Sequence, residues 1–241
     1  MTYCVGLLLN DGMVLLSDTR TNGGFDNIAT YRKMFTFEEP GERVVVIMTA
    51  GSLSVTQTTL ARLREAVEQE DATEATSILK APTMLKVASI IGATLAAVRT
   101  EVAEKMSAMA QGATASMIVA GQRRGGAMRM FLIYPEGNFI EATEDTPFLQ
   151  IGEHKYGKPI LDRVVKPATS LADAEKAVLL SMDSTLKSNL SVGMPLDLCV
   201  IERDLCQVSR ARRIEAGDEA FRMMSDAWSK ALRDGFAQIT L

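Results

Sequence analysis

Three residues near the start of the chain carry side chains that could do chemistry together: Thr2, Asp18 and Lys33. Only Met1 precedes Thr2, so its removal would leave a hydroxyl and a free α-amine on one residue, which is a nucleophile with its own general base. A lysine cation nearby would lower the pKa of that amine below its usual value of about 8, and Asp18 would keep the lysine charged and in place. These residue types indicate hydrolytic chemistry that needs no histidine.

The turn Asn10-Asp11-Gly12 predicts how these residues meet, because it stands between two strand-like segments and is a strong hairpin signal. A turn centred on Asp11 pairs Thr2 with Arg20 and Cys4 with Asp18. Directly opposed residues share a face of the sheet, so Thr2, Asp18 and Arg20 should converge. A register shift of one residue would separate them.

Lys33 lies in the next predicted strand, where the alternation of side chains places it on the same face as Phe35 and Phe37. Lysine is rarely buried unless it is paired, and Asp18 is the natural partner. An internal ion pair with a purely structural role would explain the same pattern. The presence of Thr2 beside the pair favours the catalytic interpretation.

Bulk composition limits the remaining classes of function. A chain of 241 residues that is 47% hydrophobic predicts one domain, residues 1–241. A net charge of -4 makes nucleic acid an unexpected partner, because nucleic-acid-binding surfaces are basic. The sequence has no run of about 20 apolar residues and no signal-peptide pattern, so we expect a cytoplasmic protein that does not enter a membrane. Three cysteines suit a reducing compartment, and His154, the only histidine, rules out a multi-histidine metal site. We expect no metal and no cofactor.

The order of the predicted elements indicates the fold class. Strands are predicted at Thr2–Leu9, Met13–Asp18, Lys33–Phe37, Arg43–Thr49, Ala115–Ala120, Met128–Tyr134, Asn138–Glu141, Phe148–Ile151, Leu196–Glu202 and Cys206–Ala211. Helices are predicted at Leu53–Gln69, Met84–Val102 and Ser170–Lys187, and a last helix from Asp218 has Phe221, Met224, Trp228, Ala231 and Leu232 on one face. This order predicts an α+β protein with two packed antiparallel sheets between helical layers, a four-layer αββα sandwich.

The opening MTYCVGLLLNDGMVLLSDTR, the later Lys33 and the segment Met48-Thr49-Ala50-Gly51-Ser52 resemble the start of a proteasome-type β subunit. Such subunits are N-terminal-nucleophile (Ntn) hydrolases with an αββα fold that cleave peptides. The resemblance implies that Thr2 is the nucleophile, that Asp18 and Lys33 are the charged pair beside it, and that the Gly51 N–H is an oxyanion donor.

The resemblance also implies a substrate pocket lined by Thr21, Tyr31 and Thr49, and it leaves Arg20 as a structural neighbour of the site. Within the family, residues 26–30 (DNIAT) and 151–163 (IGEHKYGKPILDR) look most like the bacterial Anbu group, whose name abbreviates "ancestral β subunit". That group begins directly at Met-Thr, without the propeptide usual in proteasomes.

Two departures from the family pattern concern the surroundings of the nucleophile. Typical β subunits have a Gly-Ser-Gly stretch whose serine supports the threonine amine, whereas Gly152 is followed here by Glu153 and His154, so that serine is missing or replaced. The family's Asp-x-x-Ser-Gly segment reads SNLSV at residues 188–192. Ser191 matches the serine of the pattern and is the expected catalytic residue, whereas Ser188 and Val192 replace its aspartate and glycine. The nucleophile is intact, but these changes put the rate of peptide hydrolysis in question.

Three functions are compatible with these residues. The first is a threonine peptidase that works as a homo-oligomer, a ring or spiral enclosing its sites, on peptide or protein substrates. The second is an Ntn amidase acting on a non-peptide or modified amide. The third is a catalytically silent assembly subunit. The resemblance also leaves open an ATP-dependent unfoldase or an operon-encoded partner, neither of which has a signature in the sequence.

Overall fold

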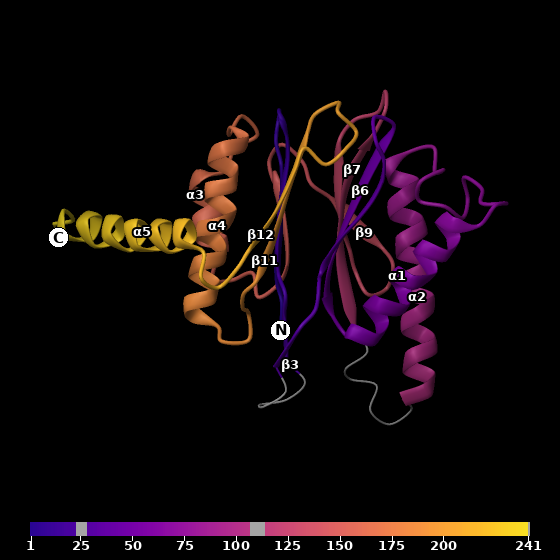
Figure 1. The fold of residues 1–241 in the computed structure, drawn as a ribbon, viewed down its shortest axis with the longest axis horizontal. Coiled ribbons are helices and arrows are strands. Elements are labelled where there is room, and N and C mark those ends of the chain that lie inside the picture. The colour runs from indigo at the N-terminus through magenta and orange to yellow at the C-terminus, as the bar shows by residue number, and fades with distance from the viewer. Residues whose placement is uncertain (23–27, 107–113, 241) are drawn as a thin grey trace.

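The computed structural model describes residues 1–22, 28–106 and 114–240. Two five-stranded antiparallel sheets pack against each other, with helices on both outer sides (Figure 1). Helices α1 and α2 cover one sheet, and α3 and α4 cover the other. This arrangement confirms the predicted four-layer αββα fold. Of the segment 26–30, Asp26 and Asn27 lie outside the described residues.

The first sheet has the strand order β10-β1-β2-β11-β12 and the second has the order β5-β6-β7-β8-β9, while β3 and β4 form a separate two-stranded ribbon. The strands are β1 (Tyr3–Leu8), β2 (Gly12–Asp18), β3 (Arg20–Asn22), β4 (Ile28–Thr30), β5 (Met34–Glu39), β6 (Arg43–Gly51), β7 (Ala115–Arg123), β8 (Arg129–Ile133), β9 (Phe139–Glu141), β10 (Phe148–Gly152), β11 (Leu196–Glu202) and β12 (Arg210–Ile214). The helices are α1 (Leu53–Glu68), α2 (Met84–Met106), α3 (Lys158–Val164), α4 (Leu171–Ser188) and α5 (Glu219–Ala237).

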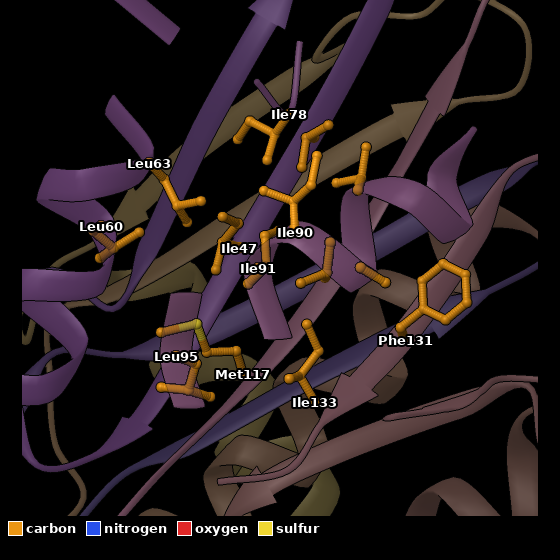
Figure 2. Packing of buried hydrophobic residues seen from close by; sticks show 14 of the residues in the cluster. Ile47, Leu60, Leu63, Ile78, Ile90, Ile91, Leu95, Met117, Phe131 and Ile133 are labelled. Carbon is orange, nitrogen blue, oxygen red and sulfur yellow. The ribbon is translucent and has the colours of Figure 1, made fainter. Parts of the chain in front are cut away.

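Three apolar clusters fill the spaces between the four layers. One joins α1 and α2 to the second sheet: Leu60, Leu63 and Leu95 lie around Ile47, and the same cluster extends to Phe131 (Figure 2). A second joins α3 and α4 to the first sheet, and a third lies between the two sheets. Each fully buried side chain of this size stabilises the fold by about 1.5–3 kcal/mol. Both faces of β1 and β2 are therefore buried, which holds the ends of these strands in fixed positions.

The opening hairpin forms, but its register differs from the prediction by one residue. Leu9 and Gly12 close the turn through backbone bonds in both directions, so the turn is centred between Asn10 and Asp11. Cys4 consequently pairs with Ser17, and the predicted pairs Thr2–Arg20 and Cys4–Asp18 are wrong. The same register brings the start of β1 opposite Asp18.

Three further elements differ from the prediction. Strand β12 begins at Arg210 rather than at Cys206, because Asp204 and Cys206 adopt the left-handed backbone conformation in the connection from β11. Helix α3 was not predicted, although Pro159 in its first turn is a helix-start signal. The β3–β4 ribbon was also missed, since its strands have three residues each.

The last two long helices begin at the predicted caps. The Ser170 side chain accepts a hydrogen bond from the Asp173 N–H at the start of α4, and Asp218 caps α5 in the same way. Helix α5 points away from the body of the molecule (Figure 1) and has no buried residue. Its predicted apolar face is therefore largely open, with Leu232 and Phe236 well exposed.

The three cysteines are free thiols in the interior. Cys4 and Cys199 belong to the cluster between the sheets, and Cys206 is buried in the loop before β12. Burial raises the pKa of Cys4 and Cys206 and raises that of Cys199 to about 12.

Candidate active site

Asp18 stands at the end of β2 with no exposed surface. Its Oδ1 accepts hydrogen bonds from the Lys33 ammonium at 2.7 Å and from the Tyr3 N–H at 3.1 Å, and its Oδ2 accepts from the Gly193 N–H at 3.3 Å. Burial raises the pKa of Asp18, and the Lys33 cation and the two N–H donors oppose that rise because they favour the carboxylate. A carboxylate so enclosed has a fixed position.

Lys33 directly precedes β5 and is held in place by its own backbone, because its carbonyl accepts the Thr49 N–H at 2.9 Å. Its side chain is only 7% exposed. The ammonium donates to Asp18, to the Arg20 carbonyl at 2.6 Å and to the Met1 carbonyl at 3.2 Å. Three acceptors match the three donors of an ammonium group, which explains how the charge is tolerated there. The expected Asp18–Lys33 pair is present even though the predicted register is not.

Thr2 precedes β1 and is almost completely buried. Its carbonyl accepts the Glu153 N–H at 2.7 Å, immediately after β10. Gly152 has φ +80°, and a Cβ there would lie 1.9 Å from the Thr2 carbonyl oxygen, so only glycine permits this approach. The chain start is thus fixed on both sides, by β2 and by β10.

The Met1 backbone contacts the Asp18–Lys33 pair. Its carbonyl carbon is bonded to the Thr2 nitrogen, and its carbonyl oxygen is the one that accepts from Lys33. Burial and the Lys33 cation lower the pKa of the Met1 amine, and the charges of Asp18 and Glu153 oppose that change. An amine at this position is therefore depleted of its proton relative to one in water.

A cavity of about 580 Å³ opens beside Thr2 and Lys33. Of the residues predicted to line a substrate pocket, Thr21 and Thr49 lie on its wall. Tyr31 does not line this cavity; its neighbour Arg32 does. The strand ribbon explains the difference, since Tyr31 forms a backbone bond with Thr19 and its side chain is exposed.

Gly51 lies on the wall of the same cavity at the end of β6. Its φ is +106°, and a Cβ at this position would lie 2.3 Å from the Thr114 carbonyl oxygen, so the backbone here requires a glycine. Gly51 and Thr2 therefore line one cavity. Its role as an oxyanion donor stays a prediction.

Arg20 and Ser191 lie around the segment that follows α4. The Arg20 guanidinium donates to the Leu190 carbonyl at 2.8 Å, and the Ser191 N–H donates to the Asn189 side chain at 2.9 Å. Gly193, two residues beyond Ser191, contributes the N–H bond to Asp18. Sequence reasoning missed this contribution because a backbone donor has no side-chain signature. The catalytic role of Ser191 stays a prediction.

No cluster of metal-ligating side chains exists within the residues that the structure describes. His154 is exposed in the turn after β10, where its ring nitrogen faces the Gly152 carbonyl. In the same described part of the chain, no helix is both long and apolar enough to cross a membrane. The arrangement offers the Thr2 hydroxyl and a buried lysine–aspartate pair, and removal of Met1 would add the Thr2 amine; together these are the groups needed for nucleophilic attack on an amide.

Comparisons with known proteins agree with this geometry. The proteasome subunit family model matches residues 2–201. An Anbu mutant from Hyphomicrobium sp. strain MC1 is 49% identical, covers 100% of this chain and 99% of its own, and has a TM-score of 0.93. Anbu from Yersinia bercovieri is 40% identical over 100% and 99% of the two chains, with a TM-score of 0.92.

A third similar structure is the helical assembly of the Anbu complex from Pseudomonas aeruginosa, whose subunit is 41% identical over 100% of this chain and 98% of its own, with a TM-score of 0.93. No curated protein matched the chain. The structural matches extend over the whole chain rather than the opening motif alone. The chain therefore belongs to the proteasome subunit family and is similar over its full length to solved Anbu subunits.

Proposed function

We propose that the protein is a threonine peptidase of the proteasome type, in which removal of Met1 exposes Thr2 as an N-terminal nucleophile. The observation that carries the proposal is the position of the Lys33 ammonium, which bonds Asp18 at 2.7 Å and the carbonyl of the Met1–Thr2 bond at 3.2 Å. An ion pair with a purely structural role has no need to reach the first peptide bond of the chain. The cavity beside Thr2 provides room for a substrate.

The chemistry follows from the exposed amine. The Thr2 amine takes the proton of the Thr2 hydroxyl as the oxygen attacks a substrate carbonyl. The Lys33 cation lowers the pKa of this amine and so favours its proton-accepting form, and the Gly51 N–H stabilises the developing oxyanion by about 3 kcal/mol. The leaving amine receives the proton, and water then hydrolyses the ester on Thr2. The same groups would serve an amidase, so the nature of the acyl group distinguishes the two activities.

Intact-mass measurement on protein purified from its own cells tests the proposal directly. We expect the mass to lack Met1 and to increase by one adduct when a threonine-directed electrophile such as a peptide epoxyketone is added. Peptide mapping should place the adduct on Thr2. Retention of Met1 together with the absence of an adduct would contradict the peptidase assignment and favour a silent subunit.

We further propose that the active form is a homo-oligomer built through α5. A groove of about 630 Å³ lies between α3, α4 and α5, lined by Val164, Leu180 and Trp228, among others. The outer half of α5 carries the exposed Leu232 and Phe236, and no residue of this helix is buried. An arm on one copy that enters a groove on the next is a heterologous contact, which generates rings or helical assemblies. The Pseudomonas relative forms a helical assembly.

Charged residues on this arm should dissociate the oligomer. A Leu232→Asp/Phe236→Asp variant is expected to run as a monomer in mass photometry, with a melting temperature within a few degrees of the parent because both side chains are already exposed. Lys230→Glu, on the other side of the helix, is the matched control, since it changes the net charge equally and should keep the parent assembly. Assembly by the double variant would show that the interface lies elsewhere.

A further inference from the structure

The peptide unit between Thr2 and Tyr3 is held at both of its polar ends. The Thr2 carbonyl accepts a hydrogen bond from the Glu153 N–H at 2.7 Å, and the Tyr3 N–H donates to the Asp18 carboxylate at 3.1 Å. A peptide unit is planar, so these two bonds fix the plane in which the Cα of Thr2 lies. Both the nitrogen and the hydroxyl-bearing carbon of Thr2 are attached to that Cα. A group that fixes Tyr3 therefore also fixes the proposed nucleophile.

The hydroxyl of Tyr3 makes a separate set of hydrogen bonds. It lies 2.6 Å from the Ser181 hydroxyl in α4, and it accepts from the Gln150 amide in β10 at 2.5 Å. Tyr3 and Ser181 have no exposed surface. The same Gln150 amide donates to the His154 carbonyl at 3.4 Å, in the turn that also supplies the Glu153 N–H. One hydroxyl thus connects β1 to α4, to β10 and, through Gln150, to the turn that bonds Thr2.

The Tyr3 and Ser181 hydroxyls have little room to move. A Cβ on Gly157, directly before α3, would lie 2.1 Å from the Ser181 oxygen and 2.7 Å from the Tyr3 oxygen, so the chain packs closely against both. Burial raises the pKa of Tyr3 to about 12, so the phenol keeps its proton at neutral pH and its bonds persist there. A satisfied network of buried polar groups rigidifies its surroundings. Phenylalanine would fill the same apolar space without making these bonds.

We propose that Tyr3 is a positioning residue of the site, whose hydroxyl, bonded to Ser181 and Gln150, holds the Thr2 nucleophile in its reactive direction. This inference rests on the proposed function. It assigns the hydroxyl no contact with a substrate or a reacting atom, because Tyr3 does not line the cavity beside Thr2. Loss of the hydroxyl would allow the start of β1 to shift within the core. A displacement of about 1 Å at a nucleophile costs up to roughly a hundredfold in rate.

The first test is the hydrolysis of a fluorogenic peptide by Met1-free protein, with the rate divided by the number of Thr2 sites that a peptide epoxyketone labels. We expect Tyr3→Phe to lower kcat per labelled site by about tenfold to a hundredfold and to keep KM within about twofold, because the cavity wall is unchanged. Ser181→Ala should give a smaller loss in the same direction, since the bond to Gln150 remains. The variant with both changes should match Tyr3→Phe alone, because Ser181 acts through that hydroxyl.

Ser77→Ala is the matched control for these variants. It also removes a buried hydroxyl, but from the connection between α1 and α2, and it should keep the parent kcat.

The pH dependence of kcat/KM separates positioning from stability. Its acid limb reports the pKa of the Thr2 amine, which the Lys33 cation lowers in the parent. The cation has less effect on an amine that has shifted from its place, so the acid limb of Tyr3→Phe should move to higher pH. A loss of folded protein alone would reduce the amplitude of the profile and leave the position of that limb unchanged.

The outcomes distinguish this inference from the proposed function. An unchanged kcat per labelled site in Tyr3→Phe, or an unchanged acid limb, would restrict the hydroxyl to a role in stability and overturn the positioning role. Losses that add in the double variant would show that Ser181 acts independently of Tyr3 and would overturn the assigned contact. A parent protein that is neither labelled nor able to hydrolyse peptides would overturn the proposed function itself.

Discussion

A Thr2→Ala variant is expected to lose covalent labelling and at least about a thousandfold in peptide hydrolysis, while its free energy of unfolding stays within about 1 kcal/mol of the parent. The hydroxyl is the only proposed nucleophile, so no second group replaces it. The fold does not depend on that side chain, because Thr2 is held by its carbonyl through Glu153 and by the register of β1 with β2 and β10.

Thr2→Ser is the matched control for this experiment. Serine keeps a hydroxyl and an amine on the same backbone, so labelling and hydrolysis should persist at a reduced rate. Activity should be followed with a peptide substrate and stability by thermal unfolding. Labelling of Thr2→Ala at the parent stoichiometry would show that the reactive group is a different residue.

Replacing Lys33 with methionine is expected to abolish hydrolysis and also to cost about 3–5 kcal/mol of stability, because an uncompensated buried charge is strongly destabilising. Asp18 is fully buried, and without Lys33 it retains only the two backbone donors for its charge. The amine of Thr2 would also lose the cation that lowers its pKa, so less of it would be able to accept a proton at neutral pH.

The destabilisation of Lys33→Met should depend on pH. Burial already raises the pKa of Asp18, and loss of Lys33 removes the largest influence that opposes the rise. The folded variant then binds a proton that the unfolded chain releases, so its stability falls as the pH rises above the unfolded pKa of about 3.9. Urea unfolding at several pH values should show the largest gap between variant and parent at neutral and alkaline pH and a smaller gap in acid.

The double variant Asp18→Asn/Lys33→Met distinguishes stability from catalysis. It removes both charges, so it should recover much of the stability lost by Lys33→Met and remain inactive. Equal stability of Lys33→Met and the parent at neutral pH would contradict the proposed energetic role of the pair. A double variant that hydrolyses peptides would contradict its proposed catalytic role.

The sequence predicted the layered fold and the Asp18–Lys33 contact for different reasons. The layers follow from periodicity, since each long helix has an apolar side and the central strands β1 and β2 are buried on both faces. The contact follows from the cost of burying a lysine at the start of an apolar strand. That argument does not depend on hairpin register, which is why the pair is present although Cys4 faces Ser17.

Features set by backbone geometry were not predictable in the same way. The centre of the Leu9–Gly12 turn differs by about half a residue from the assumed one, and side-chain patterns do not resolve so small a shift. The Gly193 N–H that holds Asp18 is a group available at any residue except proline. Arg32 lines the cavity instead of the predicted Tyr31 because of the path of the ribbon. The ribbon strand β4 has three residues, which is too short for a periodic pattern.

The buried thiols and Thr2 can be probed separately, each with its own reagent. The thiolate is the reactive form of cysteine, and all three cysteines are enclosed with raised pKa values, so a haloacetamide should modify them only in unfolded molecules. A hydroxyl-directed reagent would instead report on Thr2 in the folded state. Mass shifts from the two reagents therefore measure the integrity of the fold and the competence of the site on the same sample.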